Sequence, residues 1–142
     1  MRRVRILLAD DQPMIYGAVA SLLKPTYQLL ACVGDGRALI QAAMRMHPDV
    51  IVTDISMPML NGIEAANILR NSGSRSRIIF LTIHQDLDFI KACFAAGALA
   101  YVSKPRMSTD LLPAIQEALV GRSFVSPMAS KAASLTPASS EK

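Results

Sequence analysis

Cysteines and long apolar runs are scarce in this chain, and each shortage excludes a class of protein. The two cysteines, Cys32 and Cys93, are far apart and have no histidine beside them, which argues against a zinc site or a disulfide framework. No apolar run is long enough to span a membrane. The run after Arg5 is cut by Asp10 and Asp11, so it is too short for a signal-peptide core. We therefore expect a cytoplasmic protein with no membrane partner.

Charged residues are also few, at 18%, whereas hydrophobic residues make up 51% of the 142 residues. A disordered chain needs low hydrophobicity and high net charge, so disorder is excluded as the main state. The net charge of +4 reflects 15 Lys and Arg against 11 Asp and Glu, and an excess this mild does not indicate nucleic-acid binding. The length suits one domain with its own core.

Short apolar runs alternate with amphipathic stretches along the chain. The runs that indicate buried strands are Val4–Ala9, Gln28–Val33, Val50–Thr53, Ile78–Leu81 and Ala98–Val102. The stretches with apolar residues at helical spacing are Pro13–Leu23, Arg37–Met46, Ile63–Leu69, Leu87–Ala96 and Ser108–Val120. This alternation predicts an α/β fold, with a parallel sheet and helices on both faces. We place the domain at residues 1–125 and interpret 126–142, rich in Ser, Ala, Pro and Lys, as a flexible tail or the start of a linker.

Polar side chains follow four of the predicted strands. They are Asp10 and Asp11 after the first strand, Asp54 after the third, Thr82 after the fourth and Lys104 after the fifth. Sites in open α/β sheets lie outside the carboxyl ends of the strands, so these groups are expected to share one rim. Three carboxylates held together repel one another, and a hard cation such as Mg²⁺ is the usual remedy. A carboxylate can also accept a phosphoryl group, whose oxygens Lys104 and Thr82 would contact.

Five motifs in this order resemble the receiver domain of bacterial two-component response regulators, the CheY-like family. They are Leu8-Ala9-Asp10-Asp11-Gln12-Pro13, Val52-Thr53-Asp54-Ile55-Ser56-Met57-Pro58, Asn61-Gly62, Leu81-Thr82 and Tyr101-Val102-Ser103-Lys104-Pro105. The resemblance covers about residues 3 to 121. It implies a flavodoxin-like (βα)5 doubly wound parallel sheet of strand order 2-1-3-4-5.

The resemblance also implies a phosphoryl-transfer chemistry. Asp54 would receive its phosphoryl group from the phosphohistidine of a sensor histidine kinase or a phosphotransfer protein. Asp11, Asp54 and the backbone carbonyl of Ser56 resemble the direct Mg²⁺ ligands, and Asp10 resembles the ligand that acts through water. The chain would catalyse its own phosphorylation and dephosphorylation, with no separate turnover substrate.

Further residues resemble the parts that respond to the phosphoryl group. Thr82 and Lys104 resemble the pair that contacts it, and Tyr101 resembles the aromatic switch residue that turns inward with Thr82. For Tyr101, a ring packed in a strand for ordinary reasons is the alternative. The fourth helix, fifth strand and fifth helix form the usual output face, and the Lys104–Pro105 bond resembles the family's cis peptide.

Several positions depart from the common pattern. Ile83 follows Thr82 where a smaller residue is usual, and a bulky side chain there would crowd the phosphoryl pocket. Ser56 and His84 lie two residues after Asp54 and Thr82, where side chains line the path of the hydrolytic water and affect the lifetime of the phosphoryl group.

The stretch from Gly121 to Pro127, with the Asp-Asp-Gln-Pro start, is similar to receivers of LuxR-type helix-turn-helix regulators. DNA contact would require such a C-terminal domain, which this chain does not include. A homodimer is a further partner that the resemblance allows.

Three other functions are weighed against the phosphorylation switch. A haloacid-dehalogenase-like hydrolase would carry a second aspartate two residues after Asp54, where Ser56 stands. A dinucleotide-binding domain would show Gly-x-Gly-x-x-Gly after the first strand, and it is missing. A receiver that acts as an unphosphorylated scaffold is disfavoured by the complete set of site residues, although Ile83 keeps it open.

Overall fold

The computed structural model describes residues 3–127, which form one six-stranded sheet and five α-helices. The strands are β1 (Arg5–Ala9), β2 (Gln28–Val33), β3 (Val50–Thr53), β4 (Arg77–Thr82), β5 (Ala100–Ser103) and β6 (Phe124–Val125). The helices are α1 (Pro13–Leu23), α2 (Gly36–Met46), α3 (Gly62–Asn71), α4 (Leu87–Ala95) and α5 (Met107–Leu119), with a 3₁₀ turn at Lys104–Arg106. No helix of this described part is long and apolar enough to cross a membrane.

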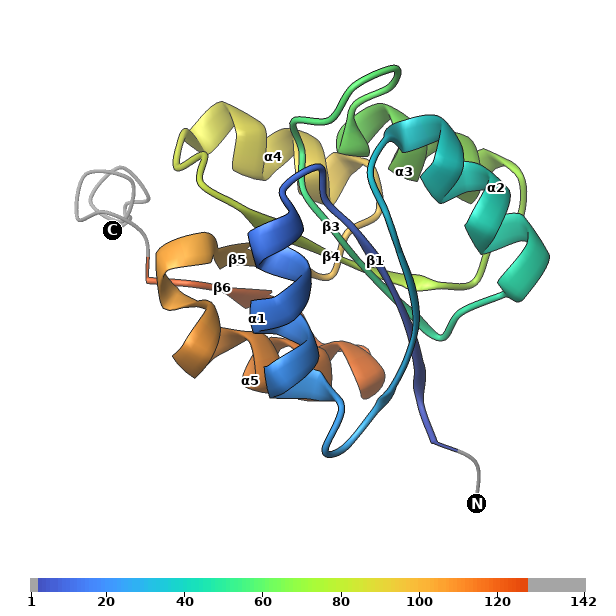
Figure 1. The fold of residues 1–142 in the computed structure, drawn as a ribbon. Coiled ribbons are helices and arrows are strands. Elements are labelled where there is room, and N and C mark those ends of the chain that lie inside the picture. Colours follow the sequence, from blue (N-terminus) through green and yellow to red (C-terminus); the bar gives the residue numbers. More distant parts are fainter. Residues whose placement is uncertain (1–2, 128–142) are drawn as a thin grey trace.

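All strands run parallel, in the order β2-β1-β3-β4-β5-β6 (Figure 1). This confirms the predicted order 2-1-3-4-5 and adds a sixth strand beside β5. The sixth strand was not predicted, because the two residues Phe124 and Val125 are too few to show an alternating pattern. The predicted tail begins at residue 126, but Ser126 is buried. Residues 128–142 of that tail lie outside the described residues.

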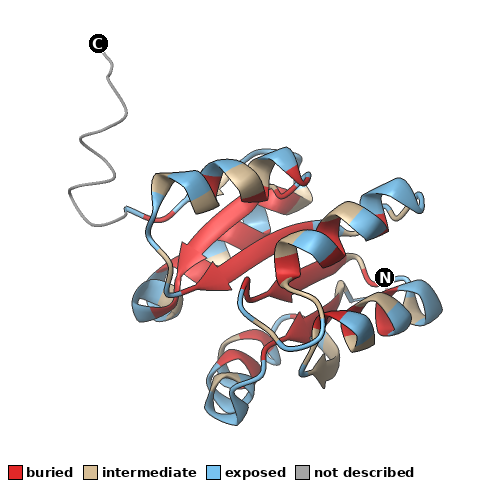
Figure 2. Cartoon of the chain, turned by 90° about the horizontal axis from the view of Figure 1, so that it is seen from above, coloured by how far each residue is buried: buried red, intermediate tan, exposed pale blue. Residues whose placement is uncertain are grey.

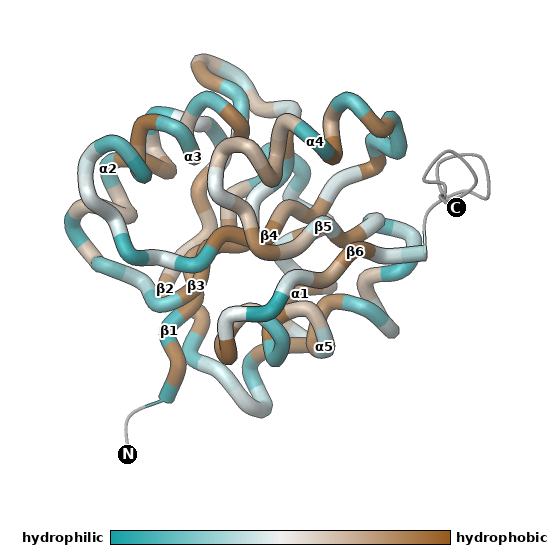
Figure 3. Tube along the Cα trace, turned by 180° about the vertical axis from the view of Figure 1, so that it is seen from behind, coloured by the Kyte–Doolittle hydropathy of each residue, from teal (hydrophilic) through white to brown (hydrophobic). Residues whose placement is uncertain are grey.

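The sheet separates two apolar layers. Helices α1 and α5 cover one face, and α2, α3 and α4 cover the other (Figure 1). Successive side chains of β1 point to opposite faces, so Leu7 packs in one layer and Leu8 in the other. The central strands β1, β3, β4 and β5 are therefore buried between the helices (Figure 2) and form the most hydrophobic part of the trace (Figure 3). This double burial explains why their sequences are continuous apolar runs.

Two of the helices, α2 and α3, begin with side-chain caps. The Asp35 carboxylate accepts a hydrogen bond from the Ala38 N–H at the start of α2. Asn61 and Glu64 form a reciprocal capping box at the start of α3. The predicted helix and strand bounds agree with the structure to within two residues. Differences of two residues occur at the end of α3 and at the start of β5, which begins at Ala100 because the left-handed turn at Gly97 comes first.

Gly62 lets α3 begin directly against the end of β3. A Cβ atom at this position would lie 2.0 Å from the Asp54 carbonyl oxygen and 3.1 Å from the Phe80 ring. The nearer atom belongs to the backbone, so no side-chain rotation relieves the contact. A residue without a side chain is therefore required beside Asp54.

We expect Gly62→Ala to lower the free energy of unfolding by roughly 2–3 kcal/mol, because the added methyl overpacks a rigid contact. Gly17→Ala is the matched control, since Gly17 lies in α1 with no atom within 4 Å of its Cβ position. That change should stabilise the protein by about 0.5–1 kcal/mol. Urea unfolding of both variants tests this, and equal effects at the two positions would contradict it.

Candidate functional site

The predicted acidic residues meet at one edge of the sheet. Asp10 directly follows β1 and Asp54 directly follows β3, and both are buried, whereas Asp11 is exposed. One carboxylate oxygen from each of the three lies within 4.8 Å of the other two. The parallel strands bring these residues together because their carboxyl ends share one rim.

Lys104 places a buried ammonium group between two of these carboxylates. Its Nζ lies 2.9 Å from both Asp10 Oδ2 and Asp54 Oδ2, and it also donates a hydrogen bond to Gln12 Oε1 at 3.0 Å. Burial of the lysine opposes its charge, but the two carboxylates outweigh this effect and hold the pKa of Lys104 above its usual value. The lysine is therefore charged at neutral pH. The contact with Gln12 was not predicted.

The Asp10 carboxylate has one backbone donor and one cation as close partners. Its Oδ1 accepts from the Gln12 N–H at 2.9 Å, and its Oδ2 lies 2.9 Å from the Lys104 ammonium. Burial raises the pKa of Asp10, and the Lys104 ammonium and the Gln12 N–H act in the opposite direction. An electron-rich oxygen in a cluster of three carboxylates fits a hard divalent cation such as Mg²⁺.

Thr82 and Tyr101 are both bonded to the backbone of His84. Thr82 is buried at the end of β4, and its Oγ1 accepts from the His84 N–H at 3.3 Å. Tyr101 is fully buried in β5, and its hydroxyl donates to the His84 carbonyl at 2.5 Å. Burial raises the pKa of Tyr101 far above its usual value. The structure therefore links the two predicted switch residues through one residue of the loop after β4.

The two loops beside the carboxylates are also joined to each other. Ser56 Oγ and His84 Nε2 are 2.8 Å apart, and the His84 ring lies against Phe89 with a centroid separation of 4.6 Å. This contact was not predicted, although both residues had been singled out by their spacing. Ile83 is 65% exposed, so most of its side chain lies in solvent.

The Lys104–Pro105 peptide bond is trans, so the cis bond expected from the resemblance is wrong. Pro105 lies within the 3₁₀ turn that leads from β5 into α5. The trans form is the default for a bond before proline, and this turn accommodates it.

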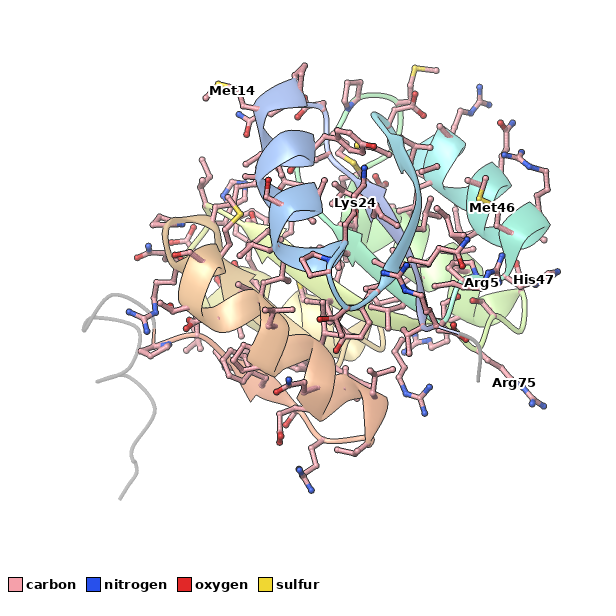
Figure 4. All side chains as sticks on the ribbon, turned by 60° about the horizontal axis from the view of Figure 1, so that its bottom comes forward. Arg5, Met14, Lys24, Met46, His47 and Arg75 are labelled. Atoms are coloured by element: carbon pink, nitrogen blue, oxygen red, sulfur yellow. The ribbon has the colours of Figure 1, made fainter. Side chains whose placement is uncertain are left out.

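A hollow of about 430 Å³ lies at the opposite end of the sheet, and no predicted site residue lines it. Arg75 and His47 line it, and Figure 4 shows His47 beside Arg5. Arg5 donates to the His47 carbonyl, which follows the last turn of α2. Helix C-termini carry partial negative charge, so basic residues are favoured here for structural reasons.

Comparison with known proteins agrees with this fold. The family profile of the response regulator receiver domain matches residues 6–116. The transcriptional regulatory protein PdtaR of Mycobacterium tuberculosis is 34% identical over 116 residues, which are 81% of this chain and 56% of the relative. The nitrate/nitrite response regulator protein NarP of Escherichia coli is 33% identical over 119 residues, 82% of this chain and 55% of the relative. The chain thus spans little more than half the length of these relatives.

Solved structures are similar as well. The crystal structure of a LuxR-family two-component response regulator from Aurantimonas sp. SI85-9A1 aligns with a TM-score of 0.83 and 33% identity. The alignment covers 89% of this chain and 91% of that one. The structure defines the class as a doubly wound α/β domain with an acidic cluster and a buried lysine at the carboxyl ends of its strands. The chain belongs to the family of response regulator receiver domains of two-component systems.

We expect Mg²⁺ to raise the melting temperature of the protein. A ligand that binds only the folded state at a hundred times its Kd adds about 2.7 kcal/mol of stability. Asp11→Asn should remove this gain without unfolding the protein, because Asp11 is exposed. The control is Asp88→Asn, an exposed carboxylate of α4, which should keep it. An unchanged Mg²⁺ effect in Asp11→Asn would show that the cation binds elsewhere.

Proposed function

We propose that Asp54 accepts a phosphoryl group from the phosphohistidine of a sensor histidine kinase or of a phosphotransfer protein, with Mg²⁺ as the cofactor. The observation that supports this best is the buried Asp54 carboxylate, which lies 2.9 Å from the Lys104 ammonium and is clustered with two further carboxylates. This arrangement positions a nucleophile beside a cation that can move to a transferred oxygen. Positioning and charge stabilisation are most of what phosphoryl transfer requires from a protein.

In the transfer, one carboxylate oxygen of Asp54 forms a bond to phosphorus as the phosphorus–nitrogen bond of the phosphohistidine breaks. The electron pair of the broken bond stays with the imidazole. The Ile55 N–H, which donates to Asp54 Oδ1 at 2.7 Å, fixes the orientation of the carboxylate. Lys104 exchanges its contact with Asp54 for a contact with a phosphoryl oxygen.

Asp10, Asp11, Asp54 and the backbone carbonyl of Ser56 would hold the Mg²⁺ ion. The ion, when bound, neutralises negative charge on the transferred group. Hydrolysis of the aspartyl phosphate returns the domain to its starting state. The chain thus catalyses its own phosphorylation and dephosphorylation and has no separate turnover substrate.

The hydrogen bonds at His84 would connect a change at Asp54 with a change at the protein surface. A Thr82 hydroxyl that turns toward a phosphoryl oxygen alters its bond with the His84 N–H, and the His84 carbonyl is the partner of Tyr101. The two residues therefore respond together. Phosphorylation shifts the balance between two conformations of the face formed by α4, β5 and α5, by its differential stabilisation of one of them.

We place the domain in the cytoplasm, where the kinase domain would reach it, and assign its output to the α4–β5–α5 face. A second copy of the chain is the proposed partner of that face. The curated relatives are transcriptional regulators by name, and contact with DNA would come from a further domain rather than from this one.

Asp54→Asn tests the acceptor directly. Incubation with acetyl phosphate and Mg²⁺ should add one phosphoryl group to the wild-type protein, seen by intact mass, and none to the variant. The added group should be labile to acid and require Mg²⁺. Labelling of a folded Asp54→Asn protein to the wild-type extent would reject Asp54 as the acceptor.

Lys104→Ala tests the link between the phosphoryl group and Tyr101. The variant should still bind Mg²⁺, but phosphorylation should no longer alter the NMR signals of the Tyr101 ring, because the cation that follows the phosphoryl group is lost. Lys91→Ala, an exposed lysine of α4, is the control and should respond normally. A normal Tyr101 response in Lys104→Ala would remove Lys104 from the switch.

A further inference from the structure

The segment after α5 returns to the sheet and ends in a buried serine. Its neighbours Val125 and Pro127 are exposed, but Ser126 has only 2% of its surface exposed. The Ser126 N–H donates to the Tyr101 carbonyl at 2.9 Å, and Ser126 Oγ accepts from the Ser103 N–H at 3.1 Å. One residue therefore holds the end of β5 at two points, directly before Lys104.

The same serine hydroxyl donates to a buried carboxylate on α5. Ser126 Oγ lies 2.6 Å from Asp110 Oδ2, and Asp110 is only 5% exposed. Arg106 donates to both oxygens of this carboxylate, at 2.9 and 3.3 Å, and Thr109 donates to Oδ1 at 3.0 Å. Burial acts to raise the pKa of Asp110, but these donors outweigh it and hold the pKa below its usual value. Asp110 is therefore ionised at neutral pH and able to bind all three donors.

Lys104 lies between the two arms of this network. Ser103 precedes it and is bonded to Ser126, whereas Arg106 ends the 3₁₀ turn that Lys104 begins and is bonded to Asp110. Both flanks of the lysine thus depend on one buried Ser126–Asp110 pair. A buried hydrogen bond of this kind is costly to leave unmade, so its two partners favour one fixed arrangement.

We propose that the Ser126–Asp110 pair positions Lys104 for the chemistry at Asp54, and couples Lys104 to residues 124–126 at the edge of the sheet. Both are positioning residues, because neither touches the carboxylates at the site. The coupling is reciprocal: a change at Lys104 alters the bonds of Ser126, and loss of Ser126 alters the placement of Lys104. The proposal rests on the proposed role of Lys104 in phosphoryl transfer.

Ser126→Ala is the principal test, and Ser123→Ala is its control, because Ser123 is an exposed serine of the same segment. The first readout is the rate at which acetyl phosphate with Mg²⁺ phosphorylates Asp54, measured by intact mass at a temperature where each variant is fully folded. Ser126→Ala should slow this rate by about tenfold, since small misplacements of a positioning group have effects of this size or larger. The control should keep the wild-type rate.

The second readout is the NMR signal of the Lys104 ammonium group, which needs no phosphorylation. It should shift in Ser126→Ala and stay in place in Ser123→Ala. If the wild-type protein is not phosphorylated but the Lys104 signal shifts in Ser126→Ala, the proposed function fails, while the role of Ser126 in positioning Lys104 stands. A folded Ser126→Ala protein with an unchanged Lys104 signal and a wild-type rate of phosphorylation would overturn the proposal. The Ser126–Asp110 pair would then have a structural role only.

Arg106→Met is the second variant, in case the loss of a buried hydroxyl prevents folding. The Arg106 side chain is 45% exposed, so its removal leaves the core intact while it breaks the other arm of the network. It should shift the Lys104 signal in the same direction as Ser126→Ala, by a smaller amount. No shift in this variant would also count against the proposal.

Discussion

The site depends on one buried ammonium group, the Nζ of Lys104, which lies 2.9 Å from carboxylates that end two different strands. Removing these three charges from water costs several kcal/mol per ion, and their attraction offsets this only in part. Apolar side chains of similar volume would stabilise a fold at least as well. Chemistry rather than stability therefore explains the cluster, and the sheet serves to hold β1, β3 and β5 in the positions where these charges meet.

The parallel arrangement of the strands also separates charge along the molecule. Carboxylates gather at the carboxyl ends of the strands, and helix C-termini gather at the opposite end, where arginines bind their carbonyl groups. Arg3 donates to the Lys24 carbonyl, Arg5 to that of His47 and Arg70 to that of Ala95. The net charge of the chain is only +4, but its charged groups are unevenly distributed, with carboxylates at one end of the sheet and arginines at the other. The basic end has structural partners, while the acidic rim has an excess of negative charge that a divalent cation would balance.

The central strands and the acidic site were predictable from sequence because their signals are local. Val50–Thr53 is apolar along its whole length since both faces are covered, and Asp54 follows it directly. Contacts set by tertiary placement gave no such signal. Lys104 meets Gln12 across 92 positions of sequence, and Ser126 stands in a stretch whose composition resembles a tail. The trans bond before Pro105 and the His84 bonds were likewise missed, because backbone and side-chain geometry decide them.

Lys104 contacts the Asp10 and Asp54 carboxylates, and its neighbours in sequence are bonded to the Ser126–Asp110 pair. This placement constrains how Lys104 could move in the proposed switch. In the proposed switch, a phosphoryl group on Asp54 would add negative charge and draw the ammonium, whereas Ser103 and Arg106 are held by the Ser126–Asp110 pair. If Ser103 and Arg106 were mobile, the turn could adjust to a small displacement of Lys104 without any change elsewhere. A buried donor or acceptor that loses its hydrogen bond costs free energy. Ser103 and Arg106 would therefore keep their positions until Ser126 and Asp110 rearrange together. The proposed switch would therefore pass between two arrangements rather than shift by degrees, as packed interiors generally do.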